Sequence, residues 1–292
     1  MGTIIKSVGV AKPFFRKRIL SLTVQSVKRC LKSSGIDAQQ IGMLVNTSVY
    51  SENHLGEPAL ASLIQKKIHF NPIRQKLLKG NSGKMFSFDL HSGGGGAIDA
   101  FQLIDGFLQA GEIQNGLVVA GDVKPASGST ENFIYSPGAA AVLLSKSDEN
   151  NGFDCFRSDT YPEFINDLES SINWDSGKFK FTVQQKKEFL NHCVSCAITS
   201  INQFFKEKNL NWEQVDLVIT SQNPAGFTSL FKKEAGIKNK VVEVNGKSNF
   251  YSAGLLFSLN KVFNNPRFTR AKNILFVTVG AGITVSLSLY KN

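Results

Sequence analysis

Residues 86–100 read FSFDLHSGGGGAIDA and contain the groups best placed to do chemistry in this chain. Apolar residues typical of a strand come first, four glycines follow, and a helical pattern begins at Ala97. In α/β enzymes such a turn binds phosphate or exposes a nucleophile. A phosphate loop requires Gly-Lys-Ser/Thr after its spacer, and Ala97, Ile98 and Asp99 do not supply it. The four glycines also match part of a dinucleotide-binding fingerprint, but any run of glycines would do so, and the match has little weight.

Ser92 and His91 are the groups nearest the glycines that could act in nucleophilic catalysis. Ser92 lies two residues before the position of a nucleophile elbow, and neighbouring residues of a strand point to opposite faces. A hydrolase is therefore the weaker interpretation. Glycines without a catalytic side chain favour close packing of the helix against its neighbouring strands.

Cys193 and Cys196 have the Cys-x-x-Cys spacing of a metal or redox motif. A zinc site needs two further ligands, and His192 is nearby, but no second pair of ligands appears in the sequence. The same spacing places both thiols on one face of an amphipathic helix. We expect buried packing residues, and we predict neither a metal nor a cofactor.

Two stretches of the chain repeat the same order of elements. Residues 22–50 and residues 186–223 each read as an amphipathic helix, a polar turn and an apolar strand. Each stretch leads to a glycine-rich turn, and each half closes with long apolar strands that are typical of a buried sheet. The pattern predicts a duplicated β-α-β unit in a layered α/β/α/β/α body, with an N-terminal half at 1–160 and a C-terminal half at 161–292.

Composition narrows the class of protein. The 292 residues are 42% hydrophobic and 19% charged, which is typical of a globular protein, and no apolar run is long enough to span a membrane. The first ten residues lack the apolar core of a secretory signal, so we expect a cytoplasmic protein. The net charge of +10 favours an acidic or phosphate-bearing partner, but no nucleic-acid motif accompanies the scattered basic residues.

Five segments resemble the thiolase superfamily, and within it β-ketoacyl-acyl-carrier-protein synthase III. They share the order and spacing of that family's strands and turns across residues 21–290. The segments are SSGIDAQQIGMLVNTSVY, FDLHSGGGGAIDAFQLIDGF, YSPGAAAVLLS, VDLVITSQN with VNGKSNFYSAG, and VGAGITVSL. The resemblance implies the five-layered thiolase fold and an acyl-transfer or condensation reaction on thioesters.

The same resemblance assigns three catalytic positions, and this chain departs from the family at each. The cysteine that accepts the acyl group corresponds to Gly94, the histidine to Ser221 and the asparagine to Lys247. Glycine offers no nucleophile, and serine is a short donor. Lys247 has two open interpretations. Either it lies in the former pocket, where it pairs with a carboxylate of the protein or binds a carboxylate ligand, or it points outward because the pocket has closed. We therefore expect no catalytic residue, with oxyanion-type backbone groups remaining at Gly94 and Gly282.

Two further sets of residues follow from the resemblance. Phe250 and Tyr251 replace small residues and are predicted to plug the pocket. Thiolase-like proteins dimerise through the strand before the nucleophile, which implies a dimer strand here; its predicted residues are Met85, Phe86, Phe88 and Leu90.

The sequence thus predicts a catalytically silent subunit that pairs with an active ketoacyl synthase III-like paralogue, or with itself. It resembles the inactive subunit of the alkylquinolone-forming synthase pair, and a specialised lipid or secondary-metabolite pathway is implied. Acyl-CoA and acyl carrier protein are further candidate partners, and nucleic acid is not. Two alternatives remain: an acyltransferase or ketoacyl synthase that acts on CoA or carrier thioesters without a cysteine, around residues 280–282, and a non-enzymatic binder of acyl ligands.

Overall fold

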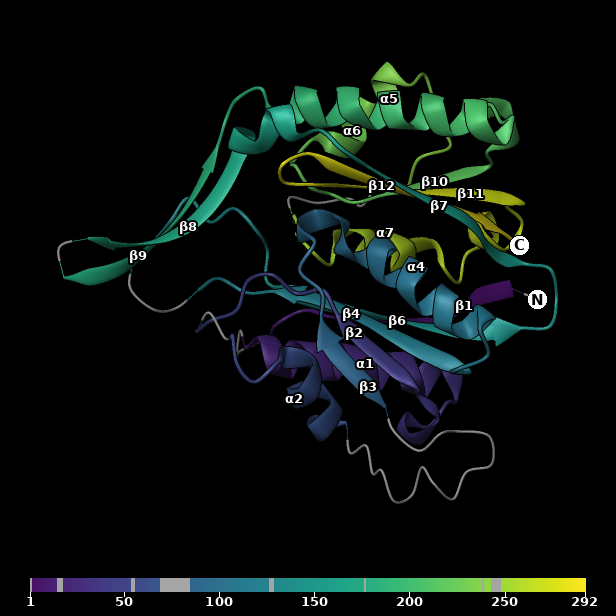
Figure 1. Cartoon of the computed structure of the whole chain (residues 1–292), viewed down its shortest axis with the longest axis horizontal. Helices are drawn as coiled ribbons and strands as arrows, with labels where there is room; N and C mark the ends of the chain where they lie inside the picture. The colour runs from purple at the N-terminus through teal and green to yellow at the C-terminus, as the bar shows by residue number, and fades with distance from the viewer. Residues whose placement is uncertain are drawn as a thin grey trace.

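The computed structural model describes residues 2–14, 18–53, 56–68, 85–125, 129–175, 177–237, 239–242 and 248–292. They form five layers, α/β/α/β/α (Figure 1). Helices α4 and α7 lie between two sheets, α1 and α2 cover the outer face of one sheet, and α5 and α6 cover the outer face of the other. The helices are α1 Ile19–Ser34, α2 Leu60–Lys67, α4 Gly96–Gln109, α5 Phe189–Lys208, α6 Phe227–Glu234, α7 Gly254–Val262 and α8 Pro266–Thr269.

The two sheets repeat one pattern of strand pairing, which confirms the predicted duplication. The first has the order β1-β6-β4-β2-β3, and the second has the order β10-β11-β12-β7. In both sheets a parallel pair (β2/β4, β10/β11) is followed by two antiparallel pairs, and the first sheet has a further parallel pair, β2/β3. The strands are β1 Gly2–Ala11, β2 Met43–Asn46, β3 Phe86–Asp89, β4 Asn115–Asp122, β6 Gly138–Ser147, β7 Gly152–Thr160, β10 Leu217–Thr220, β11 Asn273–Gly280 and β12 Thr284–Lys291.

Strand β7 lies in the second sheet, where it pairs with β12 over its whole length. The division of the chain at residue 160 had placed this strand in the N-terminal half. The change from one sheet to the other falls in residues 148–151, between β6 and β7. The division into halves at 160 and 161 stays a prediction.

Helix α4 lies between the two sheets and buries one apolar face there. Ile98, Phe101 and Ile104 are each at most 1% exposed and pack between the sheets. A Cβ on Gly116 in β4 would lie 2.3 Å from Cγ2 of Ile104, so this close approach of helix and strand requires glycine. Helix α1, on the outer face of the first sheet, also buries one stripe, and it ends where Gly35 adopts φ 70°.

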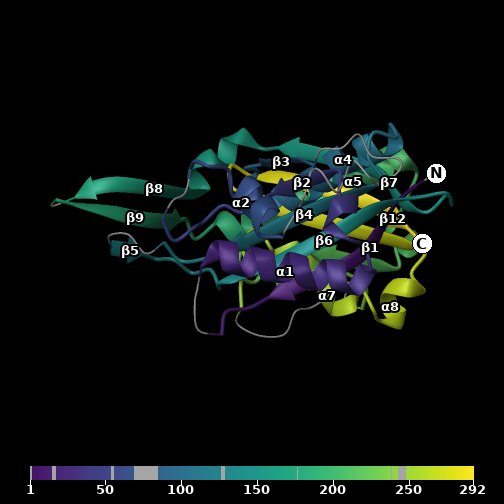
Figure 2. The same ribbon diagram turned by 90° about the horizontal axis from the view of Figure 1, so that it is seen from below.

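A three-stranded sheet forms an arm that projects from the body (Figures 1 and 2). Its order is β5-β9-β8, and β8 and β9 are joined as an antiparallel pair. The sequence interpretation had treated this region as a polar boundary between halves. Its bounds are β5 Ser129–Glu131, β8 Leu168–Asp175 and β9 Lys178–Gln185. Among all described residues, no helix is both long and apolar enough to cross a bilayer.

Candidate functional site

The glycine turn is held in place by a carboxylate at the end of β3. Asp89 accepts hydrogen bonds from the backbone N–H groups of Leu60, at 2.7 Å, and Ala61, at 2.8 Å, at the start of α2. It also accepts one from Nδ2 of Asn46 at 3.0 Å. The carboxylate thereby caps α2 and joins it to β2 and β3. The chain then turns through a 3₁₀ segment, Gly93–Gly95, into α4.

Gly94 is buried where no side chain fits. A Cβ built on it would lie 2.5 Å from the carbonyl oxygen of Val279, in the central strand β11. Real Cβ atoms essentially never approach another atom to within 3.0 Å. The obstacle is backbone of a fully buried strand, which cannot swing aside as the end of a side chain could. The position that corresponds to a nucleophile is therefore sterically closed as well as chemically empty.

The other two predicted catalytic positions are Ser221 and Lys247, and the structure describes only the first of them. Ser221 is 0% exposed, and its hydroxyl donates to the backbone carbonyl of Asn223 at 3.3 Å, so its donor is used within its own turn. Lys247 lies outside the described residues, and so does its neighbour Gly246. The two interpretations of Lys247 stay predictions.

Asn223 places a buried amide beside the turn, and the sequence interpretation missed it together with the amides of Gln222 and Asn249. Asn223 is 0% exposed, and its Nδ2 lies 3.7 Å from the point that a Gly94 Cβ would occupy. In the part of the chain that the structure describes, neither amide atom of Asn223, Gln222 or Asn249 has a hydrogen-bond partner. Such groups are costly in a core unless they are satisfied. The signal was present in the sequence: two amides follow Ser221 directly, and a third lies two residues after Lys247.

The two residues predicted to plug the pocket, Phe250 and Tyr251, pack in different core clusters. Phe250 is 2% exposed and stacks on Phe257, with ring centroids 3.7 Å apart. Tyr251 packs against Tyr135 at 4.5 Å and Tyr50 at 5.3 Å. Its hydroxyl oxygen lies 3.3 Å from where a Cβ on Gly93 would be. Tyr251 therefore lies against the glycine turn, whereas Phe250 packs against Gly138 of β6, and the role of the two rings as a plug stays a prediction.

A buried carboxylate joins the two halves beside these rings. Asp122, at the end of β4, accepts hydrogen bonds from the backbone N–H and the hydroxyl of Ser252, at 2.8 and 2.6 Å. It also accepts from the N–H groups of Val49 and Tyr50. Burial raises the pKa of Asp122, and burial likewise raises the pKa of Tyr251 well above its ordinary value. The tyrosine is therefore neutral and serves as packing and as a hydrogen-bonding group.

Ser92 belongs to a polar network rather than to a catalytic dyad. Its hydroxyl donates to Asp99, in the first turn of α4, and Ser286 donates to the other carboxylate oxygen at 2.9 Å. His91 is exposed, and within the described ranges no histidine is hydrogen-bonded to Ser92. The arrangement supplies no imidazole base for a serine nucleophile.

Gly282 follows Ala281, whose backbone nitrogen lies 3.7 Å from the point that a Cβ on Gly93 would occupy. It adopts φ 72° between β11 and β12, and a Cβ there would meet nothing within 4 Å. Gly280 is the residue that packs on the turn, because a Cβ on it would lie 3.5 Å from the backbone nitrogen of Gly95. The oxyanion roles of Gly94 and Gly282 stay predictions.

The predicted dimer strand is the edge strand of the first sheet. In β3, Phe86 is 59% exposed and Phe88 is half-buried; Met85, just before it, is buried, and Leu90, just after it, is half-buried. A groove of about 520 Å³ runs along α4, where Leu103 and Phe107 are both more than one-third exposed.

The cysteine pair lies inside α5. Cys193 and Cys196 are 0% and 4% exposed, and burial raises the pKa of both thiols, that of Cys196 to about 11. Nearby, His192 contacts Asp167 at 2.6 Å rather than either thiol. Among the described residues, no group of three or more His, Cys, Asp and Glu side chains is arranged to hold a metal ion.

Comparisons with known proteins agree with this architecture. The family model for 3-oxoacyl-(acyl-carrier-protein) synthase III matches residues 88–162, which include the glycine turn and α4. The β-ketoacyl-(acyl-carrier-protein) synthase III of Clostridium perfringens is 21% identical over 92% of this chain and 83% of its own. The corresponding enzyme of Ehrlichia ruminantium is 20% identical over 99% of this chain and 89% of its own.

Solved structures share the fold over the entire chain. The 3-oxoacyl-(acyl-carrier-protein) synthase III of Aquifex aeolicus superimposes with a TM-score of 0.82 at 17% identity, covering 100% of both chains. A variant of OleA from Xanthomonas campestris, crystallised with lauric acid and lauroyl-CoA, superimposes with a TM-score of 0.79 at 17% identity, covering 100% of this chain and 99% of its own. The five-layered thiolase-like fold is thereby confirmed.

Proposed function

We propose that the chain is a ketoacyl synthase III-like, catalytically silent subunit of a condensing or acyl-transferring complex, and its match to that family's model over residues 88–162 supports the proposal. In this proposal an active paralogue supplies the cysteine, histidine and asparagine, and the present chain completes the dimer. The complex would act on thioesters of CoA or acyl carrier protein in a specialised lipid or secondary-metabolite pathway.

The observation that carries the proposal is the closed position at Gly94. A chain that had lost only its nucleophile would leave room for one, whereas a Cβ here would lie 2.5 Å from the carbonyl oxygen of Val279. The ring of Tyr251 also packs at the turn, with its hydroxyl oxygen 3.3 Å from the point that a Cβ on Gly93 would occupy. In this proposal the packing around Gly94 keeps the chain silent while the surrounding scaffold is retained.

The surface around β3 supports pairing with a similar partner. Strand β3 ends its sheet, so its outer backbone groups can pair with the corresponding strand of another thiolase-like subunit. Phe86 on the strand and Leu103 and Phe107 on α4 are exposed apolar residues next to that edge. A like-folded partner would cover all three at once.

Native mass spectrometry of the chain purified from its own cells tests this proposal. We expect a heterodimer that contains one copy of the 32.0 kDa chain and one synthase. Phe86→Asp should abolish that species, and Phe14→Asp, a substitution at an 88% exposed residue away from β3, should leave it intact. A homodimer alone, of twice the chain mass and with no co-purifying synthase, would contradict the heterodimer.

One observation favours a second function, acyl transfer without a cysteine. The unpartnered amide of Asn223 lies beside the turn and is a donor suited to polarising a thioester carbonyl. Turnover of acyl- or malonyl-CoA by the isolated chain, lost in Asn223→Leu and kept in Ser221→Ala, would favour this alternative over silence.

A further inference from the structure

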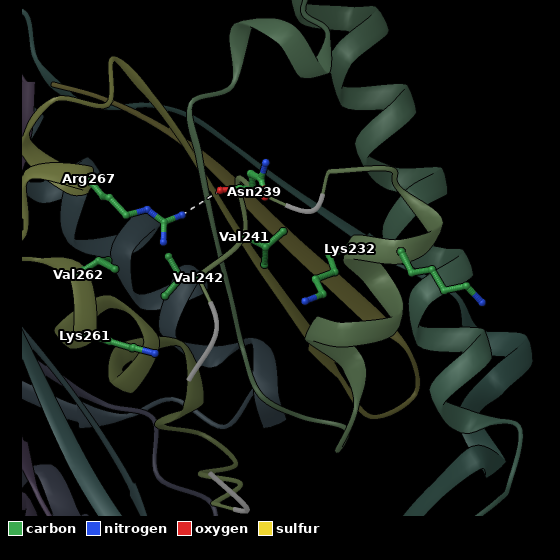
Figure 3. A pocket seen from close by; sticks show the side chains of 8 residues that line it. Lys232, Asn239, Val241, Val242, Lys261, Val262 and Arg267 are labelled. Atoms are coloured by element: carbon green, nitrogen blue, oxygen red, sulfur yellow. Dashed lines mark hydrogen bonds between the residues drawn. The ribbon is translucent and has the colours of Figure 1, made fainter. Parts of the chain in front are cut away.

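A basic cavity lies on the outer side of the second half, where α6, α7 and α8 meet (Figure 3). Its volume is about 560 Å³, which is within the usual range for a small-molecule site. Val241 and Val242 form part of its wall, beyond the edge of strand β10. It shares no residue with the glycine turn.

Cationic side chains from three different helices line this cavity. Lys232 comes from α6, Lys261 from α7 and Arg267 from α8. Figure 3 shows Arg267 and Lys261 reaching in from one side and Lys232 from the other. Lys233 also contributes to the lining, and its Nζ lies 3.9 Å from the carboxylate of Glu234. None of the described lining residues is acidic.

The guanidinium group of Arg267 makes a hydrogen bond at the cavity. Arg267 donates from Nη2 to the backbone carbonyl of Asn239 at 3.0 Å, across the mouth of the same cavity. That bond uses one of the five N–H donors of the group. A held guanidinium loses little conformational freedom when it binds an anion.

Helix-end electrostatics explain part of this arrangement. Lys232 and Lys261 lie in the last turns of α6 and α7, where a cation is favourable in any protein. That effect accounts for their places along each helix. In addition, both side chains face the cavity that Arg267 also enters.

We propose that this cavity binds a small ligand bearing at least two negative charges on phosphate. Lys232, Lys261 and Arg267 supply the charge, and Val241 and Val242 offer an apolar wall for the rest of the ligand. The phosphate belongs either to free inorganic diphosphate or to a nucleotide. The site is independent of the proposed function, since a silent or an active subunit could carry it.

Titration calorimetry with pyrophosphate and with ADP, on the full chain at low salt, tests the proposal. Lys261→Gln and Arg267→Gln should each weaken binding by about tenfold, because each removes one charge-assisted hydrogen bond. Lys28→Gln removes an exposed lysine from α1 and should change binding by less than about twofold. Arg267→Gln also removes the bond to Asn239, so Lys261→Gln keeps the test valid if that variant misfolds.

The two ligands distinguish the sources of phosphate. Equal affinity would assign the site to the phosphate groups alone, and tighter binding of ADP would add a contact with the valine wall. The proposal is overturned if neither ligand binds below about 1 mM, or if Lys28→Gln weakens binding as much as Lys261→Gln does.

Discussion

Replacing Gly94 by alanine should destabilise the protein, although alanine is normally the better residue at the start of a helix. The new Cβ would lie 2.5 Å from the carbonyl oxygen of Val279, well inside the 3.4 Å at which ordinary contact begins. Overpacking of this kind costs about 1–3 kcal/mol, and the loss of unfolded-state freedom on replacing glycine returns about 0.4–1 kcal/mol. We therefore expect a net loss of about 1–2 kcal/mol in the free energy of unfolding.

Gly106→Ala is the matched control, in the same helix. A Cβ on Gly106 would meet nothing within 4 Å, so this variant should gain about 0.5–1 kcal/mol. Urea unfolding followed by circular dichroism measures both variants, and they should shift in opposite directions from wild type. If Gly94→Ala were as stable as Gly106→Ala, the turn would have room for a side chain and the steric argument would be wrong.

Three further predictions concern other parts of the molecule. Phe250→Ala should lower the free energy of unfolding, measured with urea, by about 3–5 kcal/mol because it removes a buried ring that stacks on Phe257. The control Phe14→Ala, at an 88% exposed residue, should lower it by less than about 0.5 kcal/mol. Equal effects would exclude Phe250 as a packing residue. Burial alone would raise the pKa of Asp167, but its hydrogen bonds with His192 and Lys186 outweigh burial and hold that pKa below its ordinary value. A carboxyl group whose pKa is lowered by folding stabilises the fold at pH values above its unfolded pKa, and this stabilisation is lost as the pH falls. Asp167→Asn should therefore be about 1–3 kcal/mol less stable than wild type at pH 7, and the difference should disappear below about pH 4. A difference independent of pH would contradict the ion pair. Burial raises the pKa values of all four thiols. Iodoacetamide at pH 8 should therefore label only the half-buried Cys155 in the folded protein, and peptide mass spectrometry would detect the labelled cysteines. Rapid labelling of Cys193 or Cys196 in the native protein would contradict their packing role.

The duplicated fold could be predicted because its signal is local and repeated. Apolar runs such as residues 116–123 and 273–280 must be buried on both faces, and the same order of helix and strand occurs twice. The projecting arm was missed for the opposite reason. Its strands alternate polar and apolar residues in a short polar stretch, as in KFKFTVQQ, and that stretch resembles a boundary between halves.

The site could be located from the sequence but not understood from it. Spacing from Asp89 identified Gly94, yet only the position of Val279, 185 residues away, reveals that a side chain is excluded there. The amides of Asn223 and Asn249 carry no motif, and their burial depends on tertiary packing. The cations of the basic cavity are spread over residues 232–267 and belong to three helices, so no local pattern brings them together.

Intact-mass spectrometry of the isolated chain after incubation with an acyl-CoA tests the central claim most directly. A closed Gly94 and a Ser92 tied to Asp99 leave no group at this turn able to take an acyl chain, so the mass should stay at that of the polypeptide. Gly94→Cys should also remain unmodified, because the backbone of β11 excludes its side chain. A wild-type chain heavier by one acyl group, with the label mapping to the glycine turn, would contradict the account.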